Sequence, residues 1–323
     1  MGETRGFPVD NVQIGFVGAG NWAVNRARRF NTIEGVHVTI GWSRSERCCE
    51  RFRREIGARA TENWLEVCES EQVDAVVVST PHVFHFEQAR AALANGKHVL
   101  VETPLCLHYS QARQLADLGA QGDLVIHHGA SFRHHPDYAR GIEHLRSVGP
   151  LLYAERLAAF EGGPQRPWYR DFALSGGAFS FVSFEAIEFF EAFGHVAEVD
   201  GWDVQRGKLD VATMWVRFVE GGQARVSYGT GENVPSVGAG LVIGTDGAVQ
   251  WGQGLPRRLI RGGEVTDLPK ERELDVVLRQ CEIFVDQIRR RRDFHADLDL
   301  DLRVLKAVSE AQEKAQNRRD REM

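Results

Sequence analysis

Short apolar runs alternate with amphipathic segments along the first 128 residues of the chain. The run 75–78 (AVVV) has no polar position, which is typical of a strand buried on both faces of a parallel sheet. Gly57 and Gly96 each close an amphipathic segment and so mark helix ends. Repeated β-α units of this kind predict an α/β domain with a doubly wound parallel sheet. The predicted strands are residues 12–17, 36–42, 75–79, 98–102 and 124–128, and the predicted helices are residues 22–30, 45–56, 85–95 and 110–118.

Strand-like segments dominate after His128, and helices become fewer. Runs of strands with segregated helices predict an α+β domain with a largely antiparallel open sheet. We therefore divide the chain into a first domain of residues 1–128 and a second domain of residues 129–323. In the second domain the predicted strands are residues 151–160, 199–206, 211–219, 223–230 and 240–245, and the predicted helices are residues 138–147, 181–193, 273–290 and the segment after 302.

The composition is that of a folded protein, since 43% of the 323 residues are hydrophobic and 26% are charged. A net charge of −6 argues against a nucleic-acid surface, which usually needs a basic face. No apolar stretch is long enough to span a bilayer, and the N-terminus lacks a signal-peptide core. The five cysteines have neither CxxC nor metal-binding spacing, which is typical of reduced thiols. We therefore expect a cytoplasmic protein that binds neither nucleic acid nor membrane.

A glycine-rich turn with the pattern G-x-G-x-x-A follows the first predicted strand. Gly18 permits the tight turn, Gly20 lets the backbone approach a pyrophosphate, and Ala23 permits close contact between helix and strand. Asn21 and Trp22 begin the helix, whose unpaired N–H groups attract phosphate. Because the turn joins a strand to a helix and opens a βαβ unit, the sequence predicts a Rossmann dinucleotide-binding domain.

The end of the second predicted strand bears on the choice between NAD and NADP. NAD-binding domains usually place an acidic residue there to accept a hydrogen bond from the ribose. This chain has Ser43 and Arg44 instead, which can donate to a 2′-phosphate and pair with its charge. The alternative is that Arg44 is only the exposed start of the next helix. We expect the cofactor to be NADP(H).

Several further segments accompany the glycine-rich turn: 74–81 (DAVVVSTP) with His85 four residues later, 94–105 (ANGKHVLVETPL), 168–171 (WYRD) and 174–178 (LSGGA). With the turn, they resemble the Gfo/Idh/MocA family of oxidoreductases over essentially the whole chain. The resemblance implies a Rossmann domain, an open-sheet C-terminal domain, a nicotinamide cofactor and usually a sugar or polyol substrate. It also implies a homodimer or homotetramer formed by packing of the C-terminal sheets.

The sequence departs from the family at three positions that normally handle the substrate hydroxyl and its proton. The family's Glu-Lys-Pro motif reads Glu-Thr-Pro, so that Thr103 replaces the lysine. Phe181 and Glu185 stand where the family has an aspartate and a histidine. Loss of one oxyanion-stabilising group typically costs about 10²–10³ in rate, and a positioned acid or base typically contributes about 10²–10⁴. Ordinary alcohol–ketone chemistry by the family mechanism should therefore be crippled.

Glu185 is the main catalytic candidate, because it lies four residues after Phe181 and on the same face of a predicted helix. The neighbouring sequence is aromatic, and a carboxyl group desolvated among rings can serve as a general acid near neutrality. The alternatives are a solvated carboxylate or a structural ion pair with an arginine such as Arg170. Thr103 could donate a hydrogen bond to the substrate or the nicotinamide amide, or merely fill the space of the lysine. Tyr169 is a secondary candidate for proton donation.

Several residues match family segments near the nicotinamide end of the sheet. For Thr80, Pro81, His82 and His85, we expect contact with the cofactor through hydrogen bonding or a role at a helix start. Glu102 is expected to contact the cofactor or to brace the loop that carries it.

Three residues are candidates for the substrate pocket. Trp168 and Arg170 are expected at its wall, with core packing as the alternative. Phe181 would shape the pocket and indicates a flatter or less polar substrate than a free sugar. We expect no metal site, because adjacent histidines such as His127 and His128 point to opposite faces of a strand.

The sequence therefore predicts an NADP(H)-dependent oxidoreductase with a non-standard active site that reduces an imine, a conjugated double bond or a carbonyl of a small molecule. Relatives that resemble biliverdin reductase and thiazolinyl imine reductase also lack the lysine. Two alternatives stay open: a sugar-derivative dehydrogenase that uses Glu185 as its base, and a catalytically inactive NADP-binding sensor or regulatory protein.

Overall fold

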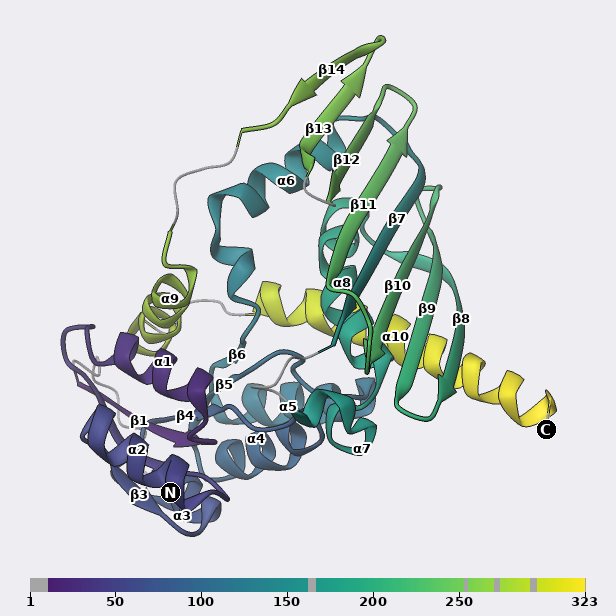
Figure 1. Ribbon diagram of the computed structural model, residues 1–323. Coiled ribbons are helices and arrows are strands. Elements are labelled where there is room, and N and C mark those ends of the chain that lie inside the picture. Colours follow the sequence, from purple (N-terminus) through teal and green to yellow (C-terminus); the bar gives the residue numbers. More distant parts are fainter. Residues whose placement is uncertain (1–10, 162–166, 253–254, 270–273, 291–294, 323) are drawn as a thin grey trace.

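The chain folds into two sheets with helices packed between and around them (Figure 1). The computed structural model describes residues 11–161, 167–252, 255–269, 274–290 and 295–322, so the first ten residues of the predicted first domain lie outside it. None of the helices within these ranges is long and apolar enough to cross a membrane.

The first sheet has six parallel strands in the order β3-β2-β1-β4-β5-β6. Every residue of β4 is buried, because helices cover both faces of the sheet. The strand order reverses direction between β1 and β4, which is where doubly wound sheets bind ligands. The predicted parallel Rossmann sheet is confirmed. Its strands are β1 (Val12–Val17), β2 (Val36–Trp42), β3 (Arg59–Thr61), β4 (Ala75–Val78), β5 (His98–Val101) and β6 (Ile126–His128).

Two sets of helices sandwich this sheet. Phe16 packs with Phe30 of α1 and Phe52 of α2 on one face, and Phe284 of α9 contacts Phe30 with ring centroids 6.3 Å apart. Helix α9 therefore returns from the C-terminal part of the chain to cover the first sheet. The helices of this part are α1 (Asn21–Phe30), α2 (Glu46–Ile56), α3 (Trp64–Glu69), α4 (His85–Ala94), α5 (Tyr109–Gly122) and α9 (Val276–Arg290).

The second sheet has eight strands in the order β14-β13-β12-β11-β7-β10-β9-β8. Only the pair β7–β10 is parallel, so the predicted open and largely antiparallel sheet is confirmed. The sequence did not predict β12, β13 and β14, which are short and lie at one end of the sheet. The strands are β7 (Leu151–Phe160), β8 (Val196–Arg206), β9 (Leu209–Phe218), β10 (Gln223–Gly231), β11 (Val237–Gly244), β12 (Ala248–Gly252), β13 (Leu255–Arg261) and β14 (Glu264–Asp267).

Helices α6 (Pro136–Arg146), α8 (Ala178–Phe193) and α10 (His295–Glu322) lie on one side of the second sheet, and no helix of the described part of the chain covers its other face (Figure 1). Phe189 and Phe190 of α8 pack with Met214 and Phe218 of β9 in the core on the covered side. The uncovered face carries several exposed large apolar side chains, namely Leu157, Trp202, Val204, Leu209, Val211 and Ile243.

Helix α10 runs along β8, the last strand of the sheet. Lys314 donates to the Val199 carbonyl over 2.6 Å, and Arg318 one turn later donates to the Gly201 carbonyl over 3.4 Å. These side chains occupy backbone acceptors that an edge strand would otherwise offer to another chain. Near its middle, α10 also accepts a bond from the backbone N–H of Tyr109 through Ser309 Oγ over 2.9 Å, which ties it to α5.

The packing of α10 on β8 depends on a glycine, because a Cβ at Gly201 would overlap the backbone of Ala311. We predict that Gly201→Ala lowers the free energy of unfolding by about 1–3 kcal/mol, the usual cost of overpacking. Urea denaturation measures this loss. Gly229→Ala, whose Cβ would have only ordinary contacts of 3.6 Å or more, is the control and should change stability by less than about 0.5 kcal/mol. Equal stability of both variants would contradict the packing described here.

Candidate active site

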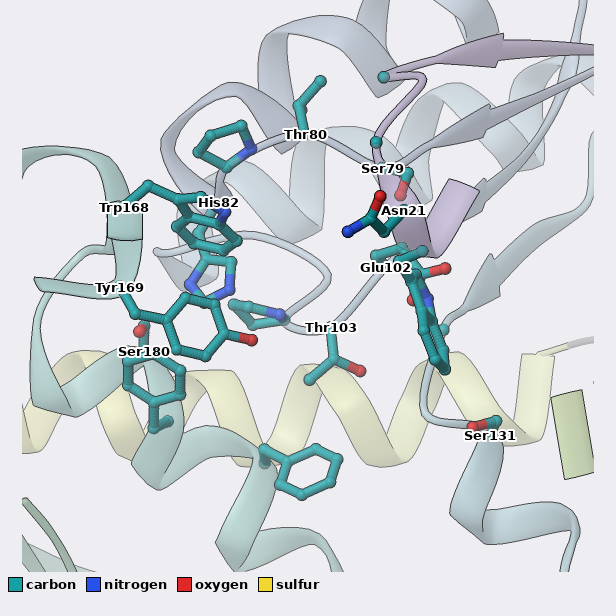
Figure 2. A pocket seen from close by; sticks show the side chains of 18 of the residues that line it. Asn21, Ser79, Thr80, His82, Glu102, Thr103, Ser131, Trp168, Tyr169 and Ser180 are labelled. Atoms are coloured by element: carbon teal, nitrogen blue, oxygen red, sulfur yellow. The ribbon is translucent and has the colours of Figure 1, made fainter. Parts of the chain in front are cut away.

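A cavity of about 770 Å³ lies between the carboxyl ends of the first sheet's strands and the covered side of the second sheet (Figure 2). Most of the residues predicted from the sequence line it. They are Gly18, Gly20, Asn21, Trp22, Ser43, Arg44, Thr80, Pro81, His82, Glu102, Thr103, Trp168, Tyr169, Phe181 and Glu185. His85 and Arg170 are not among its lining residues.

The turn after β1 is built for close backbone approach. Gly18 has φ +105°, and a Cβ there would overlap the carbonyl oxygen of Ser79. At Gly20, by contrast, a Cβ would meet nothing within 4 Å, so this position opens onto the cavity. Gly20 caps α1 with no side-chain hydrogen bond, which leaves the first N–H groups of the helix to a ligand. An open cradle at a helix N-terminus fits a pyrophosphate.

The end of β2 presents hydroxyl and cationic groups to the cavity. Arg44 is exposed, and its guanidinium lies 5.5 Å from the ring centroid of Phe84. Arg51 of α2, which was not predicted as a site residue, donates to the side chain of Asn21 and, over 3.3 Å, to the Ala19 carbonyl. The glycine-rich turn that contains Gly18 and Gly20 is therefore held by the cationic side chain of a residue in α2.

Glu102 lines the cavity and forms a buried ion pair with Arg26 of α1, with Nε and Oε1 2.6 Å apart. Arg26 is fully buried and also donates to Gln280 of α9 over 2.8 Å. Burial alone would lower the pKa of Arg26, but the neighbouring Glu102 carboxylate offsets this, and the pKa lies above its usual value. The pair therefore joins helix α1 to the end of β5.

His85 supports the cavity from behind. Its two ring nitrogens lie 2.7 Å from the Pro104 carbonyl and 2.9 Å from the Thr80 carbonyl, so it bridges the loops after β4 and β5. Burial lowers the pKa of His85. His82 lies at the cavity wall, where its Nδ1 is 2.8 Å from the Ser175 carbonyl of the second domain.

Aromatic rings form the wall on the side of the second sheet. Trp168 contacts His82 edge-on at 4.8 Å, and Tyr169 lies 5.0 Å from Phe181. Tyr228 of β10 stacks on Phe181 at 4.7 Å and 13°, and the sequence analysis did not single it out. Figure 2 shows Thr103 between this aromatic wall, with Trp168 and Tyr169, and the Glu102 side of the cavity. Thr103 thus lies where the two halves of the cavity meet.

Glu185 lines the cavity but is paired, because its Oε2 lies 2.6 Å from Nε of Arg156 on β7. The structure thus has the ion pair that the sequence left as an alternative, with Arg156 in place of the suggested Arg170. Arg170 instead pairs with Glu161 over 2.7 Å. The Glu185 carboxylate thus already accepts a hydrogen bond from a neighbouring side chain.

Comparison with known proteins identifies the fold of residues 12–130. Residues 12–130 match the model of the family described as "Oxidoreductase family, NAD-binding Rossmann fold" (GFO_IDH_MocA). Among curated proteins, an uncharacterized oxidoreductase of Streptococcus pneumoniae is 25% identical over 70% of this chain and 55% of its own length. The dTDP-3,4-didehydro-2,6-dideoxy-alpha-D-glucose 3-reductase of Actinomadura kijaniata is 32% identical over 48% of this chain and 47% of its own. The chain spans about half the length of these relatives.

Solved structures share the fold of the whole chain. Biliverdin reductase from Synechocystis sp. PCC 6803, in complex with biliverdin and NADP+, has a TM-score of 0.83 at 24% identity, over 94% of this chain and 99% of that one. A 3-ketoreductase from Actinomadura kijaniata, in complex with NADP and TDP-benzene, has a TM-score of 0.82 at 20% identity, over 94% and 98%. A third similar structure, GenD2 from gentamicin A biosynthesis, contains NAD, with a TM-score of 0.80 at 22% identity over 98% and 97%. The first domain is thus an NAD(P)-binding Rossmann fold.

The buried ion pair at Arg26 yields a stability prediction. Arg26→Met leaves the Glu102 carboxylate without its partner, and we expect a loss of about 3–5 kcal/mol in the free energy of unfolding. The double variant Arg26→Met/Glu102→Gln should recover part of this loss, because it removes the uncompensated charge. Arg28→Met, which breaks the exposed pair with Glu55, should cost no more than about 1 kcal/mol. A loss as small for Arg26→Met as for Arg28→Met in urea denaturation would show that the buried pair does not hold α1 to β5.

Proposed function

We propose that this chain, whose residues 12–130 carry the NAD-binding Rossmann domain of the Gfo/Idh/MocA oxidoreductases, is an NADPH-dependent reductase of a flat, conjugated small molecule or imine. The observation that carries the proposal is that one and the same cavity extends from the open turn at Gly20 to the aromatic wall at Phe181. A dinucleotide and a planar substrate can meet in such a cavity.

The residues of the cavity fit a phosphorylated dinucleotide. The Gly18–Gly20 turn and the N-terminus of α1 would hold the pyrophosphate, and Ser43 and Arg44 would hold the 2′-phosphate. Bound NADPH would supply a hydride. Because no carboxylate ends β2 in this chain, the adenosine side of the cavity favours the phosphorylated form.

The reaction class is inferred from what surrounds Thr103. A threonine hydroxyl cannot stabilise an oxyanion as a lysine does, which disfavours carbonyl reduction by the family mechanism. Reduction of an imine or a conjugated double bond requires less stabilisation of negative charge on oxygen. Rings such as Trp168 and Phe181 suit a flat substrate, and the structurally similar reductase that binds biliverdin gives this inference a precedent. Pairing of Glu185 with Arg156 weakens the alternative in which Glu185 acts as a free base.

We also propose a homodimer or homotetramer formed through the uncovered face of the second sheet. Trp202 is 46% exposed and Val211 is 48% exposed on this face, and exposed apolar patches often mark interaction sites. Light scattering of the purified protein tests the proposal, and a monomer at micromolar concentration would contradict it.

Cofactor choice is tested by titration of the protein with NADPH and NADH. We expect tighter binding of NADPH, and we expect Arg44→Ser to weaken NADPH binding by about tenfold to a hundredfold, which corresponds to one lost charged hydrogen bond. NADH binding should be unchanged. Arg47→Ser, an exposed arginine that does not line the cavity, is the matched control. Equal affinity of the wild-type protein for both dinucleotides would contradict the proposal that Ser43 and Arg44 bind the 2′-phosphate.

Reductase activity is tested by following NADPH oxidation with biliverdin, a cyclic imine such as 1-pyrroline, and a nucleotide-linked 3-ketosugar. We expect turnover of a conjugated or imine substrate in preference to the ketosugar. If the protein binds NADPH tightly but oxidises it with none of these compounds, the reductase proposal is contradicted in favour of a sensor role.

A further inference from the structure

Thr103 is the first of three polar side chains that lead away from the cavity. Its Oγ1 lies 3.2 Å from Nε2 of His128, and Nδ1 of His128 lies 3.0 Å from Oδ1 of Asp301. We propose that Thr103, His128 and Asp301 form a proton relay that delivers a proton to the substrate in place of the lysine that this chain lacks. The inference rests on the proposed reductase function.

The three residues come from three parts of the chain. Thr103 follows β5, His128 ends β6, and Asp301 lies on α10. His128 and Asp301 are buried, with side chains 7% and 3% exposed, whereas Thr103 lines the cavity. His128 is absent from the residues that line the main cavity, so the Thr103 hydroxyl stands between it and a substrate.

The position of Asp301 favours one arrangement of the imidazole. A carboxylate beside Nδ1 favours a proton on that nitrogen, and Nε2 then faces the Thr103 hydroxyl. Nδ1 of His128 and Oδ1 of Asp301 are close but are not aligned as a hydrogen bond, and Asp301 also pairs with Arg133 over 3.4 Å. Asp301 thus acts as a positioning residue for His128, and the same carboxylate also forms an ion pair with Arg133.

Two other imidazoles near His128, those of His127 and His85, have lowered pKa values. Burial lowers the pKa of His127 to about 3, and burial also lowers the pKa of His85. We assign proton exchange to His128 because its Nε2 contacts the Thr103 hydroxyl. Its backbone carbonyl accepts a bond of 2.9 Å from Gln280, which fixes the end of β6.

A second, much smaller cavity of about 10 Å³ lies at the far end of the relay. His128, Asp301 and Ser183 are its polar lining residues. This volume is close to the minimum for one water molecule, and these side chains can hydrogen-bond it. The site provides a position from which a proton can return to His128.

The proposed reaction is a two-electron reduction of the substrate. The substrate would gain a hydride, which a bound reduced dinucleotide would supply as it is oxidised, and a proton, which would come from the Thr103 hydroxyl. As the O–H bond of Thr103 breaks, its oxygen takes the proton from Nε2 of protonated His128. His128 becomes neutral and is protonated again from water, so that the net reaction consumes one NADPH and one proton.

Two variants and a control test the relay in the holoenzyme. With the substrate that the panel above identifies, Thr103→Val should slow NADPH oxidation by about 10²–10⁴-fold, the usual contribution of a positioned acid, and Thr103→Ser should keep most of the rate. Thr39→Val removes a buried hydroxyl of β2 that has no hydrogen-bond partner among the described residues, and it should leave the rate unchanged. A Thr103→Val protein as fast as wild type would overturn the relay and leave the reductase proposal intact.

A second measurement does not need turnover. In ligand-free protein with ¹⁵N-labelled histidines, the ring nitrogens of His128 should report a proton on Nδ1, and both Thr103→Val and Asp301→Asn should shift these signals. Unchanged His128 signals in both variants would overturn the relay. If wild-type protein oxidises NADPH with no compound of the panel, the proposed function fails, and these spectra still decide whether the three side chains are coupled.

Discussion

The buried pair of Arg26 and Glu102 is the interaction on which the site depends. It brings a charge from helix α1 into contact with the end of β5, and Gln280 of α9 accepts a further hydrogen bond from Nη1 of the same arginine. The fully buried guanidinium of Arg26 is tolerated because the Glu102 carboxylate compensates its charge. The pair therefore fixes the distance between the dinucleotide turn and Thr103, which follows Glu102 directly. A cofactor and a substrate can be held in register only if this distance is constant.

The two acidic side chains among the described residues that line the cavity are each paired with an arginine. Glu102 is balanced by Arg26 and Glu185 by Arg156. With these charges paired, the wall that faces Thr103 is dominated by rings such as Phe181 and Tyr228. Apart from these paired charges, this wall offers a ligand mainly apolar contact and ring faces, so the shape of the cavity limits which molecules fit it.

Sequence patterns predicted the architecture well, because long apolar runs and glycine stops report local structure directly. The strand β7 was predicted to the residue, whereas β3 and β14 are too short and too exposed to stand out. The phosphate turn was visible because its glycines serve a local backbone need. The partners of the site residues were not visible, since contacts such as Glu185 with Arg156 or His128 with Asp301 join distant segments. Only the folded chain shows which of many arginines and aspartates meet.

Helix α10 limits how the two halves of this chain can be exchanged with those of a related protein. One of its turns carries Asp301 next to the end of the first sheet, and a later turn protects the edge of β8. A chimera joined near residue 128 would take Thr103 and His128 from one parent and Asp301 and Gln280 from the other. Such hybrids would fold around mismatched polar partners, so the two halves of this chain must diverge together even though each has its own sheet.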